Sequence, residues 1–543
     1  MGSVISVKVE RIDHLGIVAG VIQDLGIIDM IDSRIVPDER EEITTGEAIA
    51  GMIINGLGFS DRPISLTPQF FHGKALDILI REGVTPDMLN RFKLGRSLDA
   101  AFSYGCDLLF SEIALCVCKQ EGIDLRFNCL DTTSFSLTGE YAPDSDEHTI
   151  LVTHGYSKDH RPDLKQVIQE LMVSQDGGIP FMSKSHDGNA SDNNVFRERS
   201  AAILKEFAAS EGPRYLVADS KLYTSENAAN LAYLPFITRI PGNLKVVGEV
   251  IEQSLELCTW QVIDDHTRYQ RLDLCHYGME QRWLVVYSER AYQRAGKTLA
   301  KAQARESEKV SKQLFHLQAR RFDSAESAQD ALSRIVKKLS YHKVETTEFT
   351  QHVQYASRGR PKADSPIKGI KWQITATVAP DATKVSHKQH QEACYVLGTS
   401  IPDSQLSDLE VIDGYKGQGA VERGFRFLKS PVFFVSSLYV KKPSRIEGLL
   451  MVMTLALLIY SVAQRRIRRQ LESTGETVPN QINQPTSRPT LRWVFQMLEG
   501  IHRVLVSVGE RVICIMEGIT DLRKRILQLF GQRVCQIYQI SSA

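Results

Sequence analysis

The sequence predicts an α/β protein with a mixed β-sheet, which is interrupted by an inserted β-rich domain and preceded by an N-terminal helical domain. Residues 1–123 carry helical patterns with capping signals, and from residue 124 the pattern changes to short apolar strands. Residues 244–397 then interrupt this pattern with further strand-like pieces around a long charged segment. With 543 residues, of which 43% are hydrophobic, the chain is long enough for several domains with their own cores.

The N-terminal domain, residues 1–123, has two helix-start signals. Thr44-x-x-Glu47 is a capping box before an apolar run, and Thr85-Pro86 pairs an N-cap with proline at the first helical position. Its second half offers Arg91, Lys93 and Arg96 as contacts for phosphates, whereas residues 1–50 hold ten acidic residues against four basic ones. A purely structural bundle and a module that recognises DNA ends both remain open.

Residues 124–243 predict the first part of a sheet. The expected elements are strands at 125–131, 164–174 and 179–185, a helix at 192–210, a strand at 214–220, a short helix at 226–232 and a strand at 235–242. The second and third strands are joined by Gln175-Asp176-Gly177-Gly178, a hairpin turn. The order β-β-β-α-β-α-β is that of a ribonuclease-H-like core.

The remaining chain divides into three parts. Residues 244–397 form the inserted domain, with a helical segment at 290–340, and residues 398–470 resume the core with an apolar helix at 446–463. Residues 471–543 form a linker and a C-terminal region, with a helix near 491–499, a strand-like stretch and a helix near 520–531. The apolar run 449–463 is shorter than the roughly 20 residues that span a bilayer, so we expect a buried core helix and no membrane contact.

Charge and cysteine content restrict the function. Basic and acidic residues both total 65, so nucleic-acid binding requires segregated charge. Residues 415–470 carry eleven basic residues against Glu422 and Glu447, a formal +9. The nine cysteines are scattered without the spacing of zinc ligands, which indicates reduced thiols and a cytoplasmic location.

One motif in the basic segment sets a carboxylate among residues that contact DNA: Tyr415-x2-Gln418-x3-Glu422-x6-Lys429. On a single helix these four positions fall within an arc of about 60°. An amphipathic surface helix that packs through Val421, Phe427 and Leu428 explains the spacing equally well. Glycines at 417, 419 and 424 each cost a helix about 1 kcal/mol, so we expect the helix to begin near Ala420. Tyr415 and Gln418 would then lie on a turn where glycine lets the backbone approach DNA.

Two further carboxylates follow apolar strands, Asp131 in NCLDTTSF and Asp219 in YLVADSKLY. Each alone is explained as a residue that ends a strand or caps the next element. Together with Glu422 they resemble the DDE triad of insertion-sequence transposases, and the motif resembles the Y-(2)-R-(3)-E-(6)-K signature of these enzymes. Gln418 replaces the arginine of that signature. The resemblance extends over most of residues 124–470.

This resemblance implies a Mg²⁺-dependent transposase that cleaves the ends of its element and joins them to target DNA. Asp131, Asp219 and Glu422 would be the catalytic residues and would hold two Mg²⁺ ions, or Mn²⁺, because crowded carboxylates require hard cations. A ribonuclease-H-like nuclease without strand transfer and an inactive DNA-binding relative are the alternatives. The family further implies a homodimer on double-stranded DNA of transposon ends and target, in a bacterial or archaeal cytoplasm and nucleoid-associated when bound.

The expected DNA contacts come from several segments. Tyr415 and Lys429 would hold terminal phosphates, with a weaker contribution from Gln418, which lacks charge. Of the tryptophans in the insertion, Trp260 is preferred over Trp283 and Trp372 as the ring that stacks a flipped base. Residues 357–362 resemble an AT-hook core. The complete set of expected DNA-binding residues is Tyr415, Gln418, Lys429, Arg423, Arg426, Arg239, Lys158, Trp260, Arg358 and Arg360.

Overall fold

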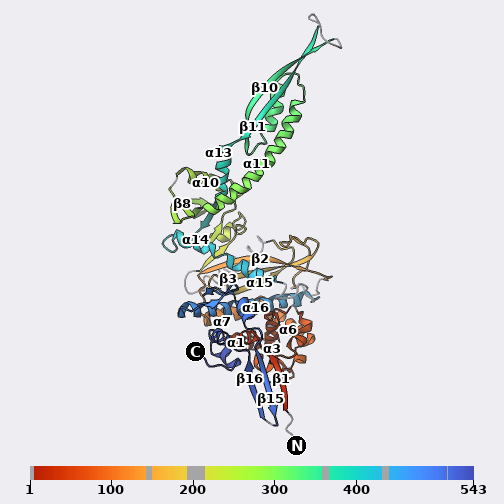
Figure 1. Ribbon diagram of the computed structural model, residues 1–543, viewed down its shortest axis with the longest axis vertical. Helices are drawn as coiled ribbons and strands as arrows, with labels where there is room; N and C mark the ends of the chain where they lie inside the picture. The colour runs from red at the N-terminus through yellow and green to blue at the C-terminus, as the bar shows by residue number, and fades with distance from the viewer. Residues whose placement is uncertain are drawn as a thin grey trace. The chain divides into compact units, whose positions relative to one another are not determined.

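The computed structural model describes residues 5–60, 62–141, 149–191, 214–257, 259–356, 366–430, 440–509 and 511–542. These residues form two compact units, described here separately (Figure 1). Unit 1 comprises Met1–Thr238 and Glu410–Ala543, and unit 2 comprises Arg239–Leu409. The mixed α/β class predicted from the sequence is confirmed. The helix expected at 192–210 lies outside the described residues.

The central sheet of unit 1 has the strand order β4-β3-β2-β5-β6. Its bounds are β2 Phe127–Leu137, β3 Lys165–Ser174, β4 Pro180–His186, β5 Tyr215–Ala218 and β6 Phe236–Arg239, with α9 Ala228–Leu231 between the last two. Strands β2, β3 and β4 are antiparallel, and β5 is parallel to β2 and to β6. Strand β2 is longer than the sequence pattern indicated, so Asp131 lies within it and not at its end.

The N-terminal part of unit 1 is mainly helical. Its helices are α1 Leu15–Leu25, α2 Ile27–Asp32, α3 Thr45–Leu57, α4 Thr67–Phe71, α5 Leu76–Leu79, α6 Arg91–Tyr104 and α7 Cys106–Gln120. The capping box is present at α3, where Thr44 and Glu47 each accept a hydrogen bond from the other's backbone N–H. The signal at Thr85-Pro86 instead starts a four-residue 3-10 helix, and Asn90 caps the following α6.

The two ends of the chain meet in a small antiparallel sheet of order β1-β15-β16 (Figure 1). Strand β1, Ile5–Arg11, pairs along its whole length with β15, His502–Val508, which pairs in turn with β16, Arg511–Glu517. The short strands β13 Val478–Pro479 and β14 Pro485–Thr486 and the helices α17 Leu491–Met497, α18 Asp521–Gln528 and α19 Gln532–Ile537 complete the C-terminal region. The sequence pattern indicated only helices before residue 123, so β1 was not expected.

Helix α16, Pro443–Thr474, is the central helix of unit 1. It begins with proline in the first turn and ends at Gly475, which adopts a left-handed conformation. By length and composition it could cross a membrane, but 89% of its apolar window is buried inside the protein. Its apolar residues therefore form the core between the N-terminal helices and the sheet, as the sequence predicted.

Glu447 is a polar residue within this apolar helix. It lies beside Cys106, Asp107 and Lys184, and its Oε2 atom has no hydrogen-bond partner among the described residues. Burial, reinforced by the Asp107 charge and opposed by Lys184, raises the pKa of Glu447 to about 7. The folded protein therefore binds a proton here at a pH where the unfolded chain has released it.

Replacing Glu447 should consequently change how stability depends on pH. Between pH 4.5 and 7 the folded state holds the extra proton, so wild-type stability falls as pH rises through this window and is then constant. We expect Glu447→Gln to be more stable than wild type at pH 8, by about 1–2 kcal/mol, and nearly unchanged at pH 5. Urea unfolding at both pH values tests this, with Glu476→Gln, an exposed carboxylate just beyond the same helix, as control. A pH-independent difference would contradict the assignment.

Unit 2 contains the sheet strands β12, β9, β8 and β7, which neighbour one another in that order, and a two-stranded hairpin. The elements are α10 Lys245–Leu257, β7 Gln261–Asp264, β8 Thr267–His276, β9 Met279–Ser288, α11 Glu289–Gln318, α12 Ala325–Val336, β10 His342–Tyr355, β11 Ile367–Pro380, α13 Ala382–Ala393 and β12 Cys394–Thr399. Helices α11 and α12 pack on the hairpin β10–β11 around Leu317, Leu332 and Ile374. Unit 2 thus includes the stretch predicted as an insertion.

Candidate active site

Two carboxylates lie at matching positions on adjacent parallel strands of unit 1. The parallel pairing of β2 and β5 ends at Leu130 and Ala218, and the next residues are Asp131 and Asp219. Thr132 donates its backbone N–H to the Asp131 carboxylate at 2.7 Å, and Lys221 does the same for Asp219 at 2.9 Å. The register of the sheet therefore brings together the two aspartates that the sequence singled out.

The pKa of Asp131 reflects its burial and the nearby Asp219 carboxylate. Burial raises its pKa to about 6, and the Asp219 charge acts in the same direction, whereas Lys158, the Thr132 N–H and Lys221 lower it. A carboxylate with a raised pKa beside a second carboxylate is a favourable place for a cation, which would restore the ionised form of Asp131.

Glu422 lies on α15, Gly419–Leu428, which packs over the face of the sheet that carries Asp131. Leu171 is the cross-strand partner of Asp131, and a Cβ on Gly424 would lie 3.9 Å from its side chain. The Glu422 side chain is exposed. Among the described residues no three Asp, Glu, His or Cys side chains converge closely enough to hold a metal ion. Asp131 and Asp219 thus lie side by side at the sheet, whereas Glu422 is on a neighbouring helix and does not converge with them.

The signature residues lie on two helices instead of one. Tyr415 is in α14, Asp408–Lys416, Gln418 is the N-cap of α15, and Lys429 is its C-cap. The four residues therefore do not share one helical arc, and the expected helix start near Ala420 is close to the observed start at Gly419. The expectation that Tyr415 lies on a turn is wrong, because Tyr415 is in α14.

Internal packing explains the glycines around this break. A Cβ on Gly417 would lie 2.1 Å from the Gln175 amide, and one on Gly414 would lie 2.7 Å from the Phe127 ring. Gln175 donates from Nε2 to the Gly414 carbonyl at 2.5 Å. The space beside Gly417 is thus filled by the turn between β3 and β4, so internal packing is sufficient to explain this glycine, and its approach to DNA stays a prediction.

Two predicted DNA-binding lysines are held beside the aspartates by the loop 154–165. Lys158 donates from Nζ to the carbonyl and hydroxyl oxygens of Thr132, both at 2.7 Å. Lys429 forms a 2.7 Å ion pair with Asp159 and lies 5.8 Å from the ring centroid of Phe135, on the same face of β2 as Asp131. The pairing of Asp159 with Lys429 could not be predicted from the sequence, because the two residues are 270 positions apart.

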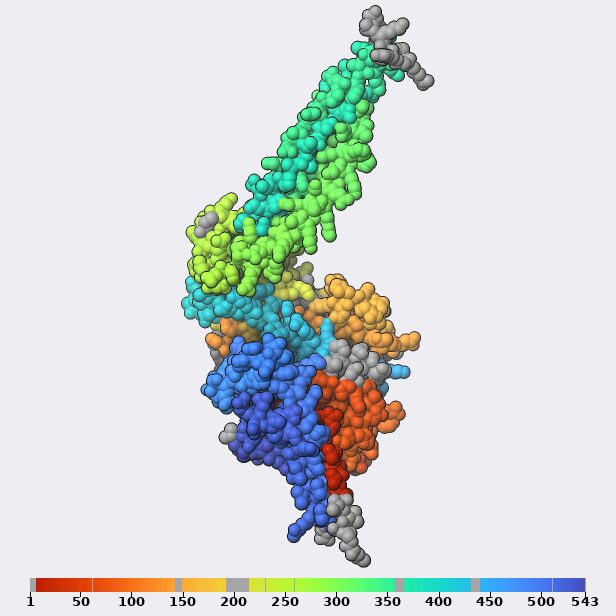
Figure 2. All heavy atoms as spheres, in the orientation of Figure 1, coloured from red at the N-terminus to blue at the C-terminus, as the bar shows by residue number. Residues whose placement is uncertain are grey.

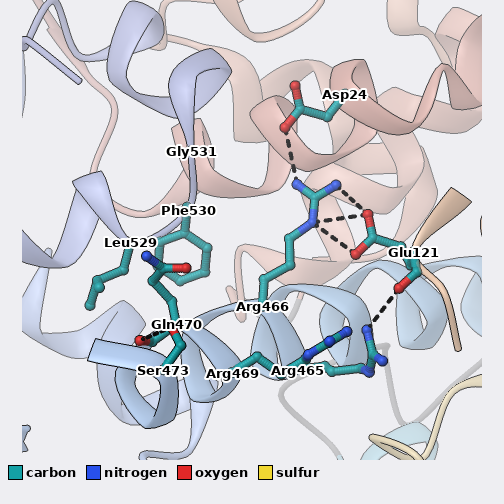
Figure 3. Close-up of a pocket in the computed structure, with 10 residues that line it drawn as sticks. All are labelled: Asp24, Glu121, Arg465, Arg466, Arg469, Gln470, Ser473, Leu529, Phe530 and Gly531. Carbon is teal, nitrogen blue, oxygen red and sulfur yellow. Dashed lines mark hydrogen bonds and ion pairs between the residues drawn. The ribbon is translucent and has the colours of Figure 1, made fainter. Parts of the chain in front are cut away.

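The basic segment 415–470 is less available to DNA than its +9 charge indicated. Arg466 pairs with Asp24 and Glu121 (Figure 3). Arg465 pairs with Asp176, and Arg445 pairs with Asp99. A cavity of about 510 Å³ beside Arg465 and Arg466 is lined by both signs of charge. Counting charges along the sequence missed these long-range partners. Arg423 and Arg426 on α15 remain exposed.

The remaining predicted DNA contacts belong to unit 2. Trp283 is fully buried and donates its Nε1–H to Gln281 at 3.0 Å, and Trp372 packs on the core of the hairpin, so both are structural. Trp260 is half-buried with Arg268 over its ring. Arg239 is exposed above Tyr395. Arg358 and Arg360, with the rest of the AT-hook-like segment, lie outside the described residues.

Comparison with known protein families identifies the chain. The family model "Transposase DDE domain" matches residues 124–459, which include the aspartate pair, Glu422 and the whole of unit 2. The protein belongs to the DDE transposase family. In this transposase, residues 7–115 also match a domain of unknown function, DUF4277, which corresponds to the N-terminal helices. The family resemblance read from Asp131, Asp219 and Glu422 is thus confirmed.

Known structures add little to this assignment. The transposase resembles a piggyBac transposase solved as a synaptic complex with hairpin DNA, with 10% sequence identity, 91% of this chain and 82% of that chain covered, and a TM-score of 0.37. A TM-score of this size is too low to establish a common fold. No curated protein matches the sequence of this transposase.

Proposed function

We propose that this transposase cleaves DNA at the ends of its insertion sequence and joins those ends to target DNA. The observation that carries the proposal is the carboxylate pair Asp131 and Asp219, aligned on adjacent strands within the matched transposase domain. Carboxylate oxygens are hard ligands suited to Mg²⁺ or Mn²⁺, and a bound cation would favour the ionised form of Asp131, whose pKa burial raises. Such ions, when bound, would stabilise charge on the scissile phosphate and activate the attacking oxygen.

Asp131 and Asp219 would bind these cations from the sheet, and Glu422 would bind from α15. Glu422 and Lys429 are seven residues apart, so they leave α15 from nearly the same side, about 20° apart around the helix and about 10 Å along it. Lys429, at the C-terminal end of this side of α15, already lies over Phe135 on the face of β2 that carries Asp131. A small movement of α15 on binding DNA would complete the triad with Glu422.

The two lysines would bind the DNA strand that is cleaved. Lys429 is paired with Asp159, a partner that a phosphate can replace because both are oxyanions. Lys158 keeps its ammonium group beside Asp131 and would draw a phosphate towards the carboxylates. Tyr415, Gln418, Arg423 and Arg426 would extend this contact along the signature segment, and a homodimer would hold two ends at once.

The test is a cleavage reaction with full-length protein, Mg²⁺ and a labelled duplex from the DNA that flanks the gene. We expect nicks at the element end followed by strand-transfer products on added target DNA. Cleavage without joined products would favour a ribonuclease-H-like nuclease. Binding of the end duplex without cleavage in Mg²⁺ or Mn²⁺ would favour an inactive relative and would contradict the proposal.

A further inference from the structure

Helix α11 of unit 2 carries a continuous stripe of basic side chains. The stripe consists of Arg290, Arg294, Lys297, Lys301, Arg305, Lys309 and Lys312. The intervals of three or four residues put all seven on one side of the helix. All seven side chains are exposed, and Figure 2 shows α11 in green along the open side of unit 2.

The opposite side of α11 fixes the direction in which this stripe points. Ala295, Leu299, Val310 and Leu317 are buried against the hairpin and its neighbours. Glu306 accepts hydrogen bonds from the backbone N–H groups of Ser340 and Tyr341, at 2.7 and 2.8 Å, and pairs with His342. These contacts prevent the helix from turning its basic side inward.

The charges of the stripe are largely uncompensated. Of the seven basic side chains, only Lys312 has an ion-pair partner among the described residues, Glu308 one turn earlier. The chain as a whole is neutral, with 65 basic and 65 acidic residues, so this concentration of positive charge is local. Seven cations on one side of a rigid helix repel each other, and a polyanion would relieve that repulsion.

We propose that this basic stripe is a second DNA-binding surface that holds the phosphate backbone of duplex DNA irrespective of sequence. The stripe runs from Arg290 to Lys312, 23 residues and about 33 Å of helix, which is close to one turn of B-form DNA. Cations at regular intervals match phosphates, which repeat regularly whatever the bases are. The proposal relies on DNA being the substrate, as proposed above, and not on the carboxylate chemistry.

The test compares full-length wild type with the triple variant Arg294→Gln, Lys297→Gln, Lys301→Gln. Affinity is measured by fluorescence anisotropy at about 50 to 200 mM salt with chelator present, on an end duplex and on an unrelated duplex of equal length. Each lost phosphate contact should reduce the slope of log affinity against log salt by about 0.9, so we expect a decrease of about 2–3 and at least a tenfold weaker affinity for both duplexes.

Matched controls make this experiment decisive. The variant Lys119→Gln, Lys524→Gln, Arg525→Gln removes three exposed basic residues from unit 1 and should leave the slope unchanged. An unchanged slope in the α11 variant, a loss confined to the end duplex, or competition by polyglutamate as strong as by DNA would each overturn the proposal.

Discussion

Asp131→Asn and Asp219→Asn are each expected to reduce strand cleavage on the order of 10³-fold without unfolding the protein. Asparagine keeps the shape of the carboxyl group but removes the negative charge that binds the cation. Because burial already favours the neutral form of Asp131, with a pKa of about 6, the substitution should leave stability unchanged or slightly increase it. The measurement is cleavage of a labelled end duplex in Mg²⁺, beside thermal unfolding of each variant.

The control for this prediction is Asp413→Asn, which changes an exposed carboxylate on α14 whose one ion-pair partner among the described residues is Lys416 on its own helix. It should cleave at close to the wild-type rate. Glu422→Gln should lose activity to a similar extent as the aspartate variants. If either aspartate variant retained more than a tenth of wild-type cleavage, the metal-binding role of the pair would be wrong. If Glu422→Gln remained active, only the assignment of Glu422 as the third metal ligand would be wrong.

Arg503→Met is expected to destabilise the protein by about 3 kcal/mol, a large fraction of the stability of a typical domain. Arg503 joins β15 to the N-terminal region, since it donates to Glu10 at 2.8 Å and to Asp77 at 2.7 Å. Glu10 is only 2% exposed, so removing the guanidinium leaves a buried carboxylate with Lys8 as its remaining ionic partner. Urea unfolding followed by circular dichroism measures the loss.

A double variant separates the two contributions to that loss. Arg503→Met with Glu10→Leu removes both buried charges and should be more stable than Arg503→Met alone. Arg40→Met, which breaks the exposed pair with Asp38, should leave stability close to that of the wild type. A double variant no more stable than the single one would show that Arg503 contributes by packing and not by charge.

The sequence predicted the aspartate pair well because its signal is local. Each aspartate follows a short apolar run, and adjacent strands of one sheet align such runs. The glycines also predicted that a helix begins near Ala420, but the packing of Gly417 against Gln175 was not predicted, because Gln175 reaches the site only through the fold. The basic segment was overestimated for a related reason. Arg465 and Arg466 look free in the sequence, but acidic partners more than 280 positions away neutralise them.

The strand pairing between the two ends of the chain has a consequence for biosynthesis. Strand β1 is synthesised long before its partner β15, which begins at His502. At about 5–20 residues per second, β1 would wait roughly half a minute or longer for that partner. Until then its apolar side chains Val7 and Val9, and the carboxylate of Glu10, have no native partner from β15. A nascent or prematurely terminated chain would therefore present an open strand edge, a substrate for chaperones and proteases, and only full-length synthesis closes the fold.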